Sequence, residues 1–158
     1  MDEKKAYEIL KKYNIDYKKF NHKVLTTLEG NLNLVEGQQV KNLVLKNKKE
    51  RQVYFIIIEE SKYLDIGKLE SEIGEKRLSF LSEDKLFEYL ACHVSAVTPL
   101  GLVYDVNNKV KVLIDDSLDL DTTLGVHPFV NNITLNIKFR DLLRIFDDIN
   151  TEYELVNI

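Results

Sequence analysis

The chain has 158 residues, 44% of them hydrophobic and 30% charged, with a formal net charge of −4 and one cysteine. The length allows one domain with its own core, and the composition excludes a disordered chain, a collagen-like fibre, a disulfide-rich scaffold and a DNA-coating protein. Its longest apolar run, Tyr54–Ile58, is far shorter than a membrane helix of roughly 20 residues, and we find no signal peptide, so we expect a cytoplasmic protein without a membrane partner.

Hydrophobic spacing predicts the elements of the first half. A helix is expected over residues 3–13 and a short strand over 17–24. Residues 26–29 have the spacing of a capping box, so a brief helix is expected to begin there. Two β-rich runs, Val40–Leu45 and Gln52–Ile58, flank a polar stretch and predict a hairpin. The second run ends in three isoleucines without alternation, which is typical of a strand covered on both faces.

This hairpin also carries an unusual charge. Residues 1–51 contain 12 Lys and Arg against 7 Asp and Glu, whereas residues 115–158 contain 3 against 9. Five of the cations fall within Lys41–Arg51, beside the single anion Glu50. Such a cluster suits local contact with a phosphodiester backbone, and a solvated hairpin tip explains it as well.

The second half interleaves predicted helices and strands. Ser82 is placed to cap a helix whose first turn holds two acidic residues. Helices are expected over 65–73, 83–90 and 139–149, and strands over 78–81, 110–114, 132–137 and 153–156. Because helices and strands interleave while a hairpin is also present, we predict an α/β fold of mixed (α+β) character, with a mixed sheet and packed helices. No linker or repeat divides the chain, which predicts a single domain over residues 1–158.

The residues offer little conventional catalytic chemistry. Neither a phosphate loop nor a dinucleotide fingerprint is present, and the three histidines lack metal-ligand spacing, so we expect no cofactor and no metal. Cys92 and His93 are adjacent, and adjacent residues of a strand point to opposite faces, which argues against a catalytic dyad. The spacing of Ser82 and Lys85 matches some acyl-transfer enzymes, but its place at a helix start favours a cap.

Three segments remain unusual after these exclusions. Lys41–Leu45 opens a strand with a cation and an amide, Ala96–Leu102 holds a proline and a glycine inside an apolar stretch, and Gly125–Asn132 is a small-residue loop that leads into a strand. Glycine permits close approach of a ligand to the backbone, and proline stiffens a loop. Taken singly, each segment is explained by an edge-strand lysine or a plain turn.

As an ordered set, the three segments resemble the YbaK/ProX-like aminoacyl-tRNA deacylases, most of all the free-standing prolyl-tRNA editing branch. The resemblance extends from about residue 5 to residue 156 and rests on these stretches: Asn21–His22 followed by Thr26, Lys41–Leu43, Leu78–Phe80, Val97–Leu102, Gly125–Pro128 followed by Asn131, and Phe139–Leu143. Two features depart from the family pattern. Val44 stands where phenylalanine is common, and Ser95–Ala96 stands where relatives often carry Gly-Ser.

The resemblance implies a fold, a reaction and a set of residues. The fold would be a mixed, curved β-sheet with flanking helices, and the reaction would be hydrolysis of the ester between an amino acid and the 3′-terminal adenosine, without metal or protein nucleophile. Lys41 would hold the terminal nucleotide, the loop at Gly125 would present backbone groups to the ester, and His127 would serve packing, hydrogen bonding or proton transfer. The residues expected to contact substrate are His22, Thr26, Asn42, Val97, Thr98, Pro99, Gly101, Pro128 and Asn131.

The activity implied is trans-editing of misacylated proline tRNA, with Ala-tRNA(Pro) as the expected substrate and prolyl-tRNA synthetase as a candidate helper. Alanine is smaller than proline, so a synthetase pocket excludes it weakly, and a second site lined by Ala96, Val97 and Thr98 would be small enough to select it. Two alternatives stay open. One is a deacylase for another misacylated tRNA such as Cys-tRNA(Pro), and the other is a non-catalytic regulator that binds an amino acid or charged tRNA.

Overall fold

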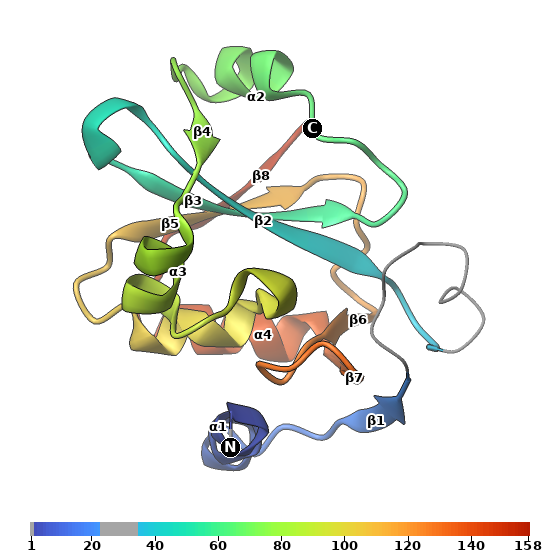
Figure 1. Cartoon of the computed structure of the whole chain (residues 1–158). Helices are drawn as coiled ribbons and strands as arrows, with labels where there is room; N and C mark the ends of the chain where they lie inside the picture. Colours follow the sequence, from blue (N-terminus) through green and yellow to red (C-terminus); the bar gives the residue numbers. More distant parts are fainter. Residues whose placement is uncertain (1, 23–34) are drawn as a thin grey trace.

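A computed structural model describes residues 2–22 and 35–158 of the chain. Within these residues the strands form two sheets, and helices lie on both sides of the larger one (Figure 1). The mixed α/β architecture predicted from the sequence is confirmed, except that two sheets replace the one that was expected. Thr26 and the brief helix expected over residues 26–29 lie outside the described residues.

The larger sheet is mixed and has the order β4-β2-β3-β5-β8. Strand β2 pairs antiparallel with β3 and β4, whereas β3 pairs parallel with β5, and β5 parallel with β8. The bounds are Val40–Lys46 for β2, Val53–Glu59 for β3, Ser79–Phe80 for β4, Val110–Asp115 for β5 and Tyr153–Val156 for β8. The predicted hairpin is therefore the β2–β3 pair, and its tip is a short 3₁₀ helix, η2 (Lys48–Glu50).

The smaller sheet has the order β1-β7-β6 and is antiparallel throughout. Its strands are β1 (Lys18–Asn21), β6 (Thr123–Val126) and β7 (Ile133–Lys138). Gly125 was expected to lie in a loop, and this expectation was wrong, because Gly125 lies within β6 opposite Asn136 of β7. A parallel bridge between Gln38 and Leu124 joins the outer edge of β6 to the residues just before β2.

Helix boundaries follow the capping residues found in the sequence. The Asp65 side chain accepts from the Lys68 amide at 3.1 Å before α2, and Ser82 accepts from Lys85 before α3. Gly74 ends α2 at a φ of 69°, where glycine is unstrained. The bounds are Asp2–Lys12 for α1, Ile66–Ile73 for α2, Glu83–Leu90 for α3 and Phe139–Asp148 for α4, with 3₁₀ turns η3 at Val94–Ala96 and η4 at Pro99–Tyr104.

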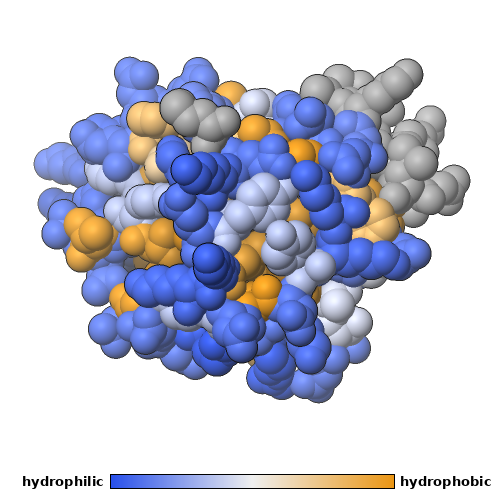
Figure 2. All heavy atoms as spheres, turned by 90° about the horizontal axis from the view of Figure 1, so that it is seen from below, coloured by the Kyte–Doolittle hydropathy of each residue, from blue (hydrophilic) through white to orange (hydrophobic). Residues whose placement is uncertain are grey.

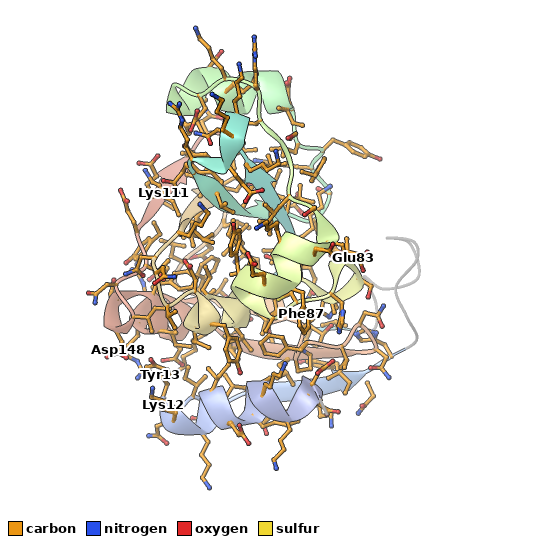
Figure 3. All side chains as sticks on the ribbon, turned by 60° about the vertical axis from the view of Figure 1, so that its left-hand side comes forward. Lys12, Tyr13, Glu83, Phe87, Lys111 and Asp148 are labelled. Carbon is orange, nitrogen blue, oxygen red and sulfur yellow. The ribbon has the colours of Figure 1, made fainter. Side chains whose placement is uncertain are left out.

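Both faces of the larger sheet are buried. Alternate residues of β3 enter different clusters, with Phe55 and Ile57 in the larger core and Tyr54, Ile56 and Ile58 in the smaller one beside α2. This confirms that the isoleucine run is a strand covered on both faces. Helix α1 closes the larger core at the other end of the molecule, where the Tyr13 hydroxyl donates to Asp148 of α4 at 2.6 Å (Figure 3).

The face that carries α1 is mostly hydrophilic, with smaller hydrophobic areas between the polar side chains (Figure 2). Among the described residues, no helix has both the length and the hydropathy needed to cross a membrane.

The η4 turn is packed too closely to accept a side chain at Gly101. A Cβ atom there would lie 2.4 Å from the Leu90 carbonyl oxygen, whereas one at Gly67 of α2 would have 3.5 Å to its nearest neighbour. We therefore expect Gly101→Ala to lower the free energy of unfolding by about 1–3 kcal/mol, because backbone must move. Gly67→Ala is the control and should be neutral or stabilising. Urea titration measures both, and equal midpoints would contradict the packing argument.

Candidate functional site

A cleft of about 220 Å³ lies where β2 begins, beside the end of β6 and the η3 turn. In Figure 1 these segments meet at the edge of the larger sheet that faces the smaller one. The walls of the cleft are Gln39, Val40, Lys41, Asn42, Glu60, Val94, Ser95, Val97, Gly125, Val126, His127 and Thr134. Lys41 and Gly125, from strands of different sheets, therefore face one space.

Lys41 places a cation at the mouth of the cleft. Its Nζ lies 5.0 Å from the ring centroid of Tyr63, a residue of the loop after β3 that is 88% exposed. Glu60 is the acidic residue of the lining; burial raises the pKa of its carboxyl and so does Glu59, while Lys41 partly offsets both. The cleft thus has one anchored ammonium group next to a partly desolvated carboxyl.

Asn42 ties the cleft wall together and leaves an acceptor unused. Its Nδ2 donates to the Val97 carbonyl at 3.3 Å, which holds the residues after η3 against β2. Its Oδ1 is buried and has no hydrogen-bond partner within the described part of the chain. A buried carbonyl oxygen without a partner costs about 1–3 kcal/mol, so a donor brought by a ligand would be favoured here.

Gly125 provides clearance and not a free donor. Its N–H donates to the Gln38 carbonyl at 3.0 Å, so it cannot also stabilise an oxyanion, as the sequence analysis expected of the backbone at this position. A Cβ atom on Gly125 would lie 2.7 Å from Gln39 Oε1 and 2.9 Å from Thr134 Cγ2. Successive N–H groups of a strand point to opposite sides. The next backbone N–H on the same side as that of Gly125 therefore belongs to His127, the residue directly after β6.

His127 is a neutral imidazole with one nitrogen already engaged. Its Nδ1 lies 3.0 Å from the Ile133 carbonyl oxygen, and since a carbonyl only accepts, Nδ1 carries the hydrogen. Burial holds the pKa of His127 below its usual 6.5, nearby His22 lowers it further, and the Ile133 carbonyl only partly offsets them. The Nε2 of His127 is consequently an acceptor at neutral pH.

His22 lies beside this imidazole. The two ring centroids are 6.5 Å apart, and His22 Nε2 lies 2.8 Å from the Thr134 hydroxyl. Thr134 alternates along β7 with the core residues Ile133 and Leu135, yet it is only 4% exposed, because its face of the strand adjoins the cleft. Two imidazoles and a hydroxyl thus adjoin one end of the cleft.

The structure brings together only part of the residue set expected from the sequence. Lys41, Asn42, Val97, Gly125 and His127 line the cleft, and His22 reaches it through Thr134. The other expected contacts do not line it: Thr98, Pro99 and Gly101 are buried in the η4 turn, and Pro128 and Asn131 lie in the β6–β7 loop.

The η4 residues have a structural role that the contacts make plain. Thr98 caps the turn by accepting from the Leu100 amide at 3.4 Å, and Pro99 is its first residue. Thr98 and Ala96, which were expected to line the pocket, are 0% and 2% exposed and lie behind the wall. The motif therefore shapes the cleft through Val97 and through its own packing.

Several lining residues were missed by sequence reasoning. Gln39, Glu60, Ser95 and Thr134 all face the cleft. The register of the β2–β3 hairpin places Glu60 at the start of β2 and therefore beside Lys41. Val40 pairs with Glu59, and the backbone N–H of Glu60 donates to the Gln39 carbonyl at 3.2 Å. Ser95 supplies a hydroxyl one position before the Ser of the Gly-Ser form common in relatives.

The structure also shows the surroundings of the single cysteine and of the other groups that could bind a metal. Cys92 is buried, and burial raises the pKa of its thiol to about 11, so the thiolate is scarce at neutral pH. Within residues 2–22 and 35–158, no group of three or more His, Cys, Asp or Glu is arranged to hold a metal ion.

Comparison with known proteins places this geometry in a family. Residues 23–145 match the family described as the aminoacyl-tRNA editing domain. The chain belongs to this family. It is 37% identical over 106 residues to the prolyl-tRNA editing protein ProX of Acetoanaerobium sticklandii, a match covering 67% of this chain and 65% of that protein. It is 31% identical over 150 residues to prolyl-tRNA synthetase associated domain-containing protein 1 of Danio rerio, covering 92% of this chain and 81% of that protein.

Solved structures share the fold across nearly the whole chain. A crystal structure described as a candidate trans-editing enzyme for prolyl-tRNA synthetase superposes with a TM-score of 0.72 at 16% sequence identity, covering 99% of this chain and 97% of the other. At that identity the likeness establishes the fold alone. It agrees with the two-sheet architecture described above.

The clearance at Gly125 can be tested by a double-mutant cycle. We expect Gly125→Ala to lower the free energy of unfolding by about 1–3 kcal/mol, because its methyl group would press on the Thr134 methyl. Adding Thr134→Ser removes that methyl and keeps the hydroxyl near His22, so it should recover part of the loss. Urea unfolding of both single variants and the double variant gives the coupling, and strictly additive effects would refute the contact.

Proposed function

We propose that this chain, as one editing domain over residues 1–158, is a trans-editing deacylase that hydrolyses misacylated proline tRNA, with Ala-tRNA(Pro) as its preferred substrate. The observation that carries the proposal is the single cleft shared by Lys41, Gly125 and a neutral His127. The names of relatives that edit or associate with prolyl-tRNA machinery support the substrate class.

An aminoacyl ester is already activated, so the cleft needs to position a water and stabilise developing charge. The water oxygen bonds to the ester carbonyl carbon, the bond from that carbon to the ribose oxygen breaks, and the ribose oxygen takes the proton that the water loses. The Nε2 of His127 accepts a hydrogen bond from the water or from the free ribose hydroxyl. Lys41 pairs with the phosphate or ribose of the terminal nucleotide.

Selection by size follows from the walls of the cleft. Val40, Val97 and Val126 narrow a space of about 220 Å³ that must also admit the ester and part of the ribose. A synthetase pocket separates substrates that differ by one methylene by only about 1–3 kcal/mol, whereas a second, smaller site rejects the larger one sterically. Alanine therefore suits this cleft better than proline does.

The cleft also offers hydrogen-bond acceptors for the positively charged amino group of the substrate. An α-ammonium group needs acceptors, and the lining offers the Glu60 carboxyl and the unpartnered Oδ1 of Asn42. Association with prolyl-tRNA synthetase would bring the misacylated tRNA to a protein whose net charge of −4 does not itself attract a polyanion.

Deacylation of Ala-, Cys- and Pro-tRNA(Pro) tests the proposal. We expect the wild-type chain to release alanine fastest, and Lys41→Ala to lower kcat/KM for Ala-tRNA(Pro) by about 10–100-fold, because a charge-assisted contact worth about 1.5–3 kcal/mol is lost. Lys4→Ala, an exposed residue of α1, is the control and should leave the rate unchanged.

The alternatives give different outcomes in the same assay. Faster release of cysteine would assign Cys-tRNA(Pro) as the substrate, and tight binding without release of any amino acid would indicate a regulator. Equal activity of Lys41→Ala and Lys4→Ala would remove Lys41 from the mechanism.

The depressed pKa of His127 predicts a specific pH dependence. The imidazole is neutral above its pKa, so kcat/KM should fall on the acid side with a midpoint below 6.5, as His127 becomes protonated. In His127→Asn this acid limb should disappear along with most of the rate. A limb that persists in His127→Asn but vanishes in His22→Asn would assign the titration to His22 instead. Measured pH profiles of kcat/KM for the three proteins decide between the two imidazoles.

A further inference from the structure

A second hollow, separate from the cleft, is lined by residues of the β2–β3 hairpin tip and of the segment just after α2. Figure 1 shows where the hairpin tip and α2 lie in the fold. It has a volume of about 370 Å³, and four of its six lining residues are cations. We call Lys48, Lys49, Arg51 and Lys76 the basic corner; Asn47 and Glu75 complete the lining.

The cations of the basic corner have no ion-pair partner in the part of the chain that the structure describes. Elsewhere lysines pair with carboxylates, as Lys62 does with Asp115 at 3.0 Å and Lys85 with Glu88 at 3.2 Å. Within residues 2–22 and 35–158, no carboxylate oxygen lies within 4.0 Å of a basic-corner cation. Four like charges repel one another, and Glu75 is the one acidic residue among the six that line the hollow, so an anionic ligand would be favoured there.

The two carboxylates closest in sequence to the basic corner, Glu50 and Glu75, accept hydrogen bonds from uncharged donors. The Glu75 carboxylate accepts hydrogen bonds from the Asn47 side-chain Nδ2 at 3.0 Å and from the Tyr54 hydroxyl. The Glu50 side chain accepts from the Tyr89 hydroxyl at 2.8 Å. Both carboxylates are thereby held by uncharged groups, and the corner stays positive.

The hairpin tip is held in one shape. The backbone N–H of Asn47 donates to the backbone carbonyl of Gln52 at 3.1 Å. In return, the backbone N–H of Gln52 donates to the side-chain Oδ1 of Asn47 at 2.9 Å. Lys49 and Glu50 adopt φ values of 62° and 54°, a conformation that usually favours glycine. The turn that carries Lys48, Lys49 and Arg51 is therefore held by hydrogen bonds, which lowers the entropic cost of holding a ligand. The fourth cation, Lys76, lies just after α2.

The distance between the cleft and the basic corner fits the length of a short stretch of RNA. Strand β2 joins Lys41 in the cleft to Lys48 in the basic corner, and seven residues of extended chain span about 20–23 Å. Stacked nucleotides advance about 3.4 Å along a strand, so this span matches about six nucleotides. A tRNA whose acylated end lies in the cleft would then present the first phosphates of its acceptor duplex at the hairpin tip.

We infer that the basic corner binds backbone phosphates of the tRNA acceptor stem and so aligns the acylated 3′ end with the cleft. The inference rests on the proposed function, since it takes the cleft as the place of the ester. Phosphate contacts of this kind position an RNA without reading its sequence, and their strength falls with salt.

The test compares a long and a minimal substrate. We expect Lys48→Glu combined with Arg51→Glu to lower kcat/KM about tenfold or more for full-length Ala-tRNA(Pro) at low salt, and to leave hydrolysis of 3′-O-alanyl-adenosine within twofold of wild type. The slope of log kcat/KM against log salt for the tRNA should become shallower by about two, one for each phosphate contact removed.

The matched control is Lys4→Glu combined with Lys11→Glu, which makes the same change in net charge on α1, at the other end of the molecule (Figure 1). An equal loss in the control would overturn the inference by showing that only overall charge matters. A loss of similar size on alanyl-adenosine would overturn it as well, because the minimal ester cannot reach the hairpin tip.

Binding of an acceptor-stem RNA minihelix that carries no amino acid, followed by fluorescence anisotropy, separates this inference from the proposed function. If wild type hydrolyses neither ester, the proposed function fails, and the minihelix still decides the corner. Binding weakened about tenfold in the Lys48→Glu/Arg51→Glu variant, but not in the α1 control, supports the corner. Equal binding by wild type and both variants overturns it.

Discussion

The site depends on one close approach, that of the outer edge of β6 to the residues just before β2. The Gly125 amide donates to the Gln38 carbonyl at 3.0 Å, and this bond joins two sheets that otherwise have separate strand orders. Any side chain at position 125 would meet Gln39 and Thr134. Glycine is therefore needed here for space, and the cleft exists because two strand edges meet without a side chain between them.

This constraint also explains the electrostatic character of the cleft. The β6–β7 hairpin that contacts Gln38 carries His127 into a partly buried position, where the Ile133 carbonyl fixes the hydrogen on Nδ1. Burial then keeps the imidazole neutral by lowering its pKa. On the opposite wall, β2 brings an ammonium group and an amide with a free acceptor. A neutral acceptor thus faces a cation across a small space, an arrangement suited to an ester with a phosphate beside it.

Local patterns predicted the elements whose residues carry their own signals. Ser82 marks the start of α3, and the apolar run of β3 marks a buried strand. Strand β6 escaped prediction because its four residues include a glycine and gain their strand geometry from partners far along the chain. The ordered motifs located the cleft, but they could not separate Val97, which lines it, from Thr98, which caps a turn behind it.

Electrostatic range shows why a protein of net charge −4 can still hold an anionic polymer. Screening at physiological salt acts over about 8 Å. Lys41 and the basic corner lie about 20–23 Å apart along β2, so each acts as a separate positive site. Asp148, by contrast, lies beside Tyr13 on the side of the molecule that carries α1 (Figure 3). An acidic group more than one screening length from these cations weakens their attraction for an anion only slightly. The charge pattern therefore favours a polyanion aligned with β2 over one spread across the surface.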